Sequence, residues 1–152
     1  MYKRILVPLD GSKLAESVLP HVEAVAKAFK ASSVTFVRVV EPVQPHTEAD
    51  AVISNEESKT IASAHYLEAK EYLKNLTAQL KWNGIHIRAE VLPTGHPADM
   101  IVRFANKNNM DLIIIATHGR SGVLRWFMGS VAEKILRSSS TPILMIRVTH
   151  QQ

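Results

Sequence analysis

The sequence contains no cysteine among its 152 residues. A disulfide framework, a thiolate nucleophile and a cysteine-ligated metal are therefore excluded. Long apolar runs are also missing, since none approaches the roughly 20 residues that a membrane-spanning helix needs. The segment from Met1 to Pro8 enters a strand pattern without the architecture of a signal peptide. We therefore expect a cytoplasmic protein with no membrane partner.

An excess of one charge is missing as well, because the formal net charge is only +4. With 46% hydrophobic and 21% charged residues, the composition is that of an ordinary globular protein, and its length predicts one domain over residues 1–152. Basic residues gather only at Arg120, Arg125, Lys134 and Arg137. No long basic run or interleaved aromatic set is present, so we expect no nucleic-acid partner. A small anionic ligand suits this basic cluster better.

Strand and helix patterns alternate along the whole chain. Apolar runs predict buried strands at Ile5–Leu9, Leu112–Ala116, Ile143–Val148 and Val34–Val40, the last interrupted only by Thr35 and Arg38. A period of two predicts one half-exposed strand at Ile85–Val91. Helical spacing predicts helices from Ser12 as N-cap to about Lys30, from Lys59 to Trp82, from Pro97 and from Ser130. Such alternation predicts an α/β fold: a five-stranded, parallel, open sheet with helices on both faces. The segment from Glu41 to Ser58 is predicted as a long loop, either a lid over the sheet or a disordered connection.

The order of the strands follows from the strand at Ile85–Val91. Its alternation indicates an edge position, which makes 3-2-1-4-5 the expected order. Ligands of such sheets bind beyond the carboxyl ends of the strands, where the strand order reverses. That point lies between the first and fourth strands, and we expect Asp10 and the Ala116–Gly129 loop to meet there.

The stretch from Asp111 to Val131 has the layout of a phosphate site. A buried strand leads into a glycine-bearing loop, His118 to Gly129, and Ser130 with Glu133 forms the Ser-x-x-Glu pattern of a capping box. Glycines let the backbone approach a ligand, and the free N–H groups of a helix start face an anion. The loop is neither a Walker A motif nor a Gly-x-Gly-x-x-Gly turn. An ordinary βα connection can also contain glycines, so structural and phosphate-binding interpretations both remain open.

Two segments together resemble a known family. Ile-Leu-Val-Pro-Leu-Asp-Gly-Ser at residues 5–12, and Ala-Thr-His-Gly-Arg-Ser-Gly at 116–122 followed by Gly-Ser-Val at 129–131, resemble the universal stress protein family. The resemblance covers essentially the whole chain. It implies a Rossmann-like sheet of the adenine nucleotide alpha hydrolase type. In the ATP-binding branch the loop reads Gly, two residues, Gly, nine residues, Gly and Ser or Thr; Gly119, Gly129 and Ser130 match it, while Ala116 replaces the first glycine.

The resemblance implies a nucleoside site at the ends of the first two strands. Pro8 and Leu9 would lie against the nucleoside. Asp10 would bond toward the ribose and help to hold a divalent cation, Mg or Mn, together with the phosphates. Val39 would meet the adenine edge through its backbone.

The resemblance likewise implies that the fourth strand and the glycine loop carry the rest of the nucleotide. Ile115 and Ala116 would form the bottom of the ribose pocket. The phosphates would be cradled by backbone N–H groups and one hydroxyl, from Gly119, Gly129, Ser130 and Val131. We add Arg120 as a phosphate contact because of its charge and position.

The expected function is that of an ATP-binding stress-response or signalling module with at most slow hydrolysis. The resemblance implies a homodimer formed through the strand Ile143 to Val148, in agreement with an apolar edge that invites pairing. Two alternatives stay open. A genuine ATP hydrolase would need a base, for which Asp10 and His118 are the only candidates, so that its catalytic residues are unknown. The second alternative is a partner-binding scaffold with a vestigial nucleotide site. The sequence motif does not discriminate ATP from AMP or a cyclic nucleotide.

Overall fold

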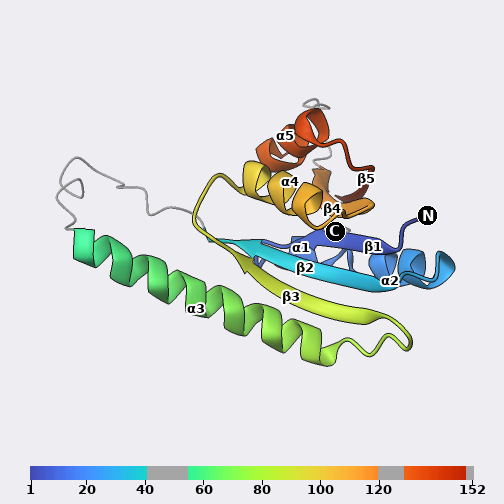
Figure 1. The fold of residues 1–152 in the computed structure, drawn as a ribbon, viewed down its shortest axis with the longest axis horizontal. Coiled ribbons are helices and arrows are strands. Elements are labelled where there is room, and N and C mark those ends of the chain that lie inside the picture. The colour runs from blue at the N-terminus through green and yellow to red at the C-terminus, as the bar shows by residue number, and fades with distance from the viewer. Residues whose placement is uncertain (41–54, 120–128, 150–152) are drawn as a thin grey trace.

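The computed structural model describes residues 1–40, 55–119 and 129–149. Five parallel strands form one sheet in the order β3-β2-β1-β4-β5. In chain order the elements are β1 (Arg4–Pro8), α1 (Lys13–Glu16), α2 (Leu19–Ala28), β2 (Ser33–Val39), α3 (Asn55–Gln79), β3 (His86–Leu92), α4 (Pro97–Lys107), β4 (Leu112–Gly119), α5 (Ser130–Ser138) and β5 (Ile143–Thr149). Helices α4 and α5 lie together on one side of the sheet, and α3 runs along β3 (Figure 1). The predicted α/β fold and strand order are confirmed.

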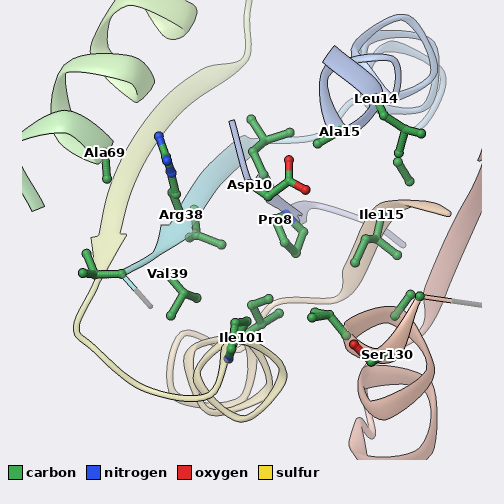
Figure 2. A pocket seen from close by; sticks show the side chains of 18 of the residues that line it. Pro8, Asp10, Leu14, Ala15, Arg38, Val39, Ala69, Ile101, Ile115 and Ser130 are labelled. Carbon is green, nitrogen blue, oxygen red and sulfur yellow. The ribbon is translucent and has the colours of Figure 1, made fainter. Parts of the chain in front are cut away.

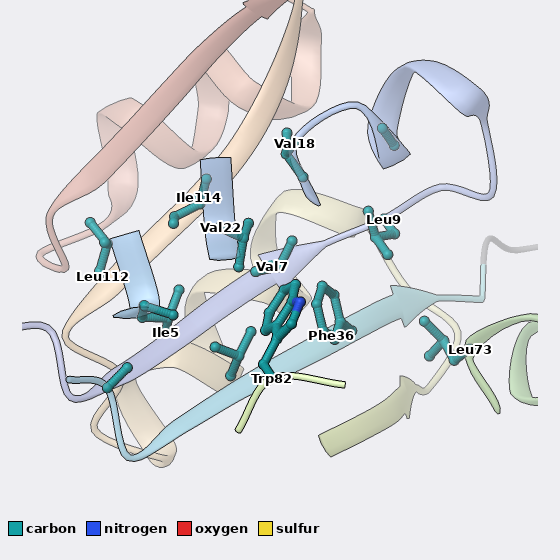
Figure 3. Close-up of a cluster of buried hydrophobic side chains, with 14 residues drawn as sticks. Ile5, Val7, Leu9, Val18, Val22, Phe36, Leu73, Trp82, Leu112 and Ile114 are labelled. Atoms are coloured by element: carbon teal, nitrogen blue, oxygen red, sulfur yellow. The ribbon is translucent and has the colours of Figure 1, made fainter. Parts of the chain in front are cut away.

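Alternate residues of the central strands pack into two separate cores. One core lies against α2 and the end of α3 and contains Ile5, Val7, Phe36 and Trp82 (Figure 3). The other lies under α4 and α5 and contains Leu6, Val37, Ile101, Ile113 and Ile135. Successive side chains of a strand point to opposite faces, so the largely apolar runs seen in the sequence are needed to fill both cores.

The helix predicted from Ser12 to about Lys30 is divided in two, so that prediction was wrong in its length. Ser12 does cap α1, because its hydroxyl accepts a hydrogen bond from the Ala15 N–H at 3.1 Å. Pro20 lies in the first turn of α2. Proline has no N–H to donate to the carbonyl of residue 16, and its ring clashes with that carbonyl in a continuous helix. The break leaves α1 as a short helix beside the end of β1.

The sheet has two different edges. The predicted edge position of β3 is confirmed, and α3 packs against it. Helix α3 begins at Asn55, four residues before the predicted start, and the rest of the predicted Glu41–Ser58 loop lies outside the described residues. Strand β4 continues to Gly119, three residues beyond the predicted end, because it pairs with β5 as far as Thr149. Among the described helices, none combines the length and apolar character required to cross a membrane.

Candidate functional site

The sheet opens between β1 and β4, on its carboxyl side. These two strands are paired only at Ile5 with Leu112 and at Leu6 with Ile113, whereas β1 and β2 remain paired along all of β1 as far as Pro8. Beyond Leu6 the two strands therefore separate. This separation creates the crevice that a reversal of strand order predicts.

A cavity of about 520 Å³ occupies this crevice. Figure 2 shows side chains from the carboxyl ends of β1, β2 and β4, from α3, α4 and the start of α5 around it. Nine of the eleven residues predicted for the site line the cavity: Pro8, Leu9, Asp10, Val39, Ile115, Ala116, Gly129, Ser130 and Val131. Gly119 ends β4, and its relation to the cavity is not described, while Arg120 lies outside the described residues.

The start of α5 differs from the predicted capping box, which was wrong. Gly129 is the N-cap, with φ −52° and ψ 142°, and Ser130 is already the first helical residue. The Gly129 carbonyl accepts from the Glu133 N–H at 3.0 Å, and the Glu133 carboxylate turns to Arg137 at 2.7 Å. No side chain among the described residues caps this helix. The N–H groups of its first turn are consequently available to an anion in the cavity.

Gly129 itself leaves room for a ligand. A Cβ atom built on this residue meets no other atom of the described residues within 4 Å, and its φ of −52° suits any residue. The described part of the chain therefore does not itself demand a glycine here, and the open side of the residue would let a ligand approach the backbone.

Asp10 follows the end of β1 as an exposed residue at the cavity wall. Its Oδ1 atom accepts a hydrogen bond from the Ser12 N–H at 2.8 Å, which fixes the turn into α1. The carboxylate has no salt bridge to a described cation. It is therefore free to accept from hydroxyl groups or to bind a cation.

Ala116 fits the backbone that replaces the first glycine of the motif. It lies within β4, where it pairs with Ile146, and the positive-φ residues of the described chain do not include it. An alanine costs nothing in such extended backbone. The substitution therefore introduces no strain into this wall of the cavity.

The basic cluster near the glycine loop contributes less than the sequence suggested. Lys134 pairs with Asp99 at 2.7 Å, and Arg137 pairs with Glu133 at 2.7 Å. The hydrogen bond from Lys134 lowers the pKa of Asp99 below its ordinary value. Neither cation lines the cavity, and the other two members of the cluster lie outside the described residues.

Sequence reasoning missed one wall of the cavity, which α3 and β2 form. Arg38 on β2 and His65, Glu68 and Ala69 on α3 line this side. Arg38 forms an ion pair with Glu68 at 3.2 Å and lies over the ring of Tyr72, with 5.3 Å from Cζ to the ring centroid. A charged residue near the end of an apolar strand was a usable signal for Arg38, whereas the helical residues needed the three-dimensional arrangement.

A parallel Rossmann-like sheet with a cavity at the reversal of its strand order defines the class: an α/β domain of the kind whose ligands bind beyond the carboxyl ends of the strands. Within this class, residues 1–147 match the model of the universal stress protein family. The chain belongs to this family.

Individual relatives agree with this assignment. Universal stress protein MJ0531 of Methanocaldococcus jannaschii is 35% identical over 147 residues, which cover 97% of this chain and 83% of the relative. The solved structure of MJ0577 from the same organism has a TM-score of 0.78 at 28% identity and covers 99% of both chains. A solved universal stress protein in complex with cAMP shares the fold, with a TM-score of 0.59 at 23% identity over 95% of this chain and 97% of its own.

Proposed function

We propose that this protein is an ATP-binding stress-response or signalling module with at most slow hydrolysis. The observation that carries the proposal is the cavity between β1 and β4, where an uncapped helix start faces an exposed carboxylate across an apolar floor. A nucleotide needs these three surfaces. Backbone N–H groups bind phosphates, a carboxylate accepts from ribose hydroxyls, and apolar side chains cover a base. The solved family member in complex with cAMP supports an adenine nucleotide as the ligand.

The residues divide into a nucleoside side and a phosphate side. Pro8, Leu9 and Val39 would cover the nucleoside, with Ile115 and Ala116 beneath the ribose. The first turn of α5 would bind the phosphates through the residues Gly129, Ser130 and Val131, with Gly119 and Arg120 from the preceding segment. These roles are our assignment, made from the position of the cavity-lining residues and from the family motif.

A divalent cation, Mg or Mn, would accompany the phosphates and neutralise part of their charge. Asp10 is the residue that would help to hold it. Groups of three or more His, Asp or Glu that could hold a metal do not occur among the described residues. The cation would therefore bind with the nucleotide, since phosphate oxygens must supply the remaining ligands.

Calorimetric titration with ATP and Mg²⁺ tests the proposal. The matched variants are Gly129→Val, at the cavity, and Ala24→Val, at an exposed site on α2. A Cβ atom at position 129 meets no atom of the described residues, and the valine side chain would occupy the space that we assign to phosphate. We expect binding in the wild type, its loss in Gly129→Val and its retention in Ala24→Val.

The opposite results are equally informative. Absence of heat in the wild type, with no nucleotide released on denaturation, would contradict the proposal and favour a scaffold with a vestigial site. A genuine hydrolase would be favoured if the wild type released phosphate steadily from ATP and His118→Ala released much less while it still bound ATP.

We also propose a homodimer through β5. Its edge is uncovered in the sheet, and Ile143, Leu144, Met145 and Ile146 are only partly buried. Pairing with a second copy would cover this apolar edge. We expect Ile143→Lys to shift the sedimentation coefficient toward the monomer, whereas Leu136→Lys, at an exposed site on α5, leaves it unchanged. Equal sedimentation of both variants and the wild type would contradict this interface.

A further inference from the structure

The wall of the cavity formed by β2 and α3 contains an arginine with three contacts. The side chain of Arg38 is only 22% exposed, although its strand ends at the cavity. Its guanidinium forms the ion pair with Glu68 and lies over the ring of Tyr72. In Figure 2 the side chain points between Ala69 of α3 and Asp10.

The third contact is with the turn that carries Asp10. A Cβ atom built on Gly11 would lie 3.1 Å from Nη1, 3.2 Å from Cζ and 3.4 Å from Nη2 of Arg38. Three such similar distances place Gly11 over the face of the guanidinium rather than at its edge. Gly11 also has a φ of +89°, which side chains disfavour. The face of the guanidinium therefore lies where a side chain at position 11 would project, and both this spacing and the positive φ favour glycine there.

Tyr72 links the same arginine to α1. Its hydroxyl donates to the Glu16 Oε1 atom at 3.1 Å, while the Glu16 Oε2 atom accepts from Lys13 at 2.8 Å. Burial and the neighbouring Glu16 carboxylate raise the pKa of Tyr72, which keeps this donor protonated. Helix α3 is thereby connected to α1 through Tyr72 and to the Asp10 turn through Arg38.

We propose that Arg38 is a positioning residue for the nucleotide: it holds the turn of residues 10–12 so that the Asp10 carboxylate meets the ribose hydroxyls. The inference rests on the proposed function, because Asp10 needs a ribose to act on. Arg38 itself contacts α3 and lies beside Gly11, and it is Asp10 that would bind the ribose. A lysine cannot replace it, because an ammonium group lacks the flat face on which Gly11 lies.

The test compares ATP with 2′,3′-dideoxy-ATP, which lacks the ribose hydroxyls. In the wild type we expect ATP to bind about tenfold more tightly, the range of a hydrogen bond to a charged group. In Arg38→Met and Arg38→Lys this ratio should fall toward one, while the affinity for dideoxy-ATP changes less than about twofold. The matched control is Arg88→Met, an exposed arginine on β3 that does not line the cavity.

Hydrogen exchange of the Ser12 amide provides a measurement that needs no nucleotide. This amide donates to Asp10 Oδ1, so a displaced turn should exchange faster. We expect the Ser12 amide hydrogen to exchange faster in both Arg38 variants, and at the wild-type rate in Arg88→Met. Unchanged exchange, an unchanged ratio, or an equal loss of both nucleotides would overturn the inference. If the wild type binds neither nucleotide, the proposed function fails, and the exchange measurement alone decides whether Arg38 positions the turn.

Discussion

The two ends of the sheet use an aspartate in opposite ways. At the amino end, Asp111 precedes β4 and accepts two backbone hydrogen bonds, from the Lys3 N–H at 2.9 Å and the Arg4 N–H at 3.0 Å. At the carboxyl end, Asp10 follows β1 and accepts one, from a residue of its own turn. Asp111 thus ties β4 to β1, whereas Asp10 has no hydrogen bond or ion pair to a described residue across the crevice.

The pairing of the strands follows the same division. Strands β1 and β4 are paired beside Asp111 and are separate beside Asp10. We therefore expect changes at the amino end to act mainly on stability, and changes at the carboxyl end to act mainly on the proposed binding of a ligand.

The largest expected effect is on stability at the amino end. Asp111→Ala leaves two backbone N–H groups without their acceptor and should lower the free energy of unfolding by about 2 kcal/mol. Urea denaturation measures this loss, and Asp111→Asn, which keeps one acceptor oxygen, should lose about half. The affinity for ATP should not change. A changed affinity with unchanged stability would reverse the comparison.

The corresponding change at the carboxyl end should act on binding. We expect Asp10→Ala to weaken ATP binding by about tenfold, close to 1.4 kcal/mol, because a charged acceptor is removed. Its free energy of unfolding should fall by less than about 1 kcal/mol, since the carboxylate is exposed. Calorimetry and urea denaturation of the same preparation measure both quantities. A loss of stability as large as that of Asp111→Ala would remove the distinction between the two ends.

The middle of the sheet offers a smaller effect of opposite sign. The Thr35 hydroxyl on β2 is buried and has no hydrogen-bond partner in the described structure. Valine has a similar shape without the hydroxyl, so Thr35→Val should raise the free energy of unfolding by up to about 1 kcal/mol. Thermal denaturation measures the gain, with Thr94→Val at an exposed position after β3 as control. A destabilised Thr35→Val protein would show that the hydroxyl has a partner after all.

The smallest effect concerns pH and the polar groups near the cavity. The raised pKa of Tyr72 means that the unfolded chain loses this proton first, near its ordinary value of 10.0. Stability from Tyr72 is therefore complete below pH 10 and falls as the pH rises above it. Urea denaturation at pH 9 and pH 11 should show a steeper loss in the wild type than in Tyr72→Phe. Equal losses would indicate that the hydroxyl ionises freely in the folded protein.

Local patterns predicted the sheet well, because a strand buried on both faces must be apolar at every position. The period of two in β3 was sufficient to assign the edge and, with it, the strand order. The division of the first helix at Pro20 was readable in principle, since proline removes one specific N–H. The start of α5 was not, because Gly129 and Ser130 are both acceptable N-caps and the tertiary course of the chain selects between them.

The candidate site was predictable where one strand end and one motif supply the residues. Nine of the predicted residues line the cavity for this reason, although their roles in binding remain predictions. Arg38, His65 and Glu68 belong to a wall that forms only when α3 packs beside β2. Their spacing along the chain contains no trace of that contact.

Gly11 and Gly129 should change differently during evolution. The φ of +89° at Gly11 and the guanidinium beside it both favour glycine, so selection for folding alone would retain it. Gly129 has an ordinary φ and no described atom within 4 Å of an added Cβ, so the proposed ligand is what would keep larger residues out. A descendant that abandoned nucleotide would keep the first glycine and lose the second. The residue at position 129, rather than the number of glycines, should therefore indicate whether a protein of this lineage has kept ligand binding.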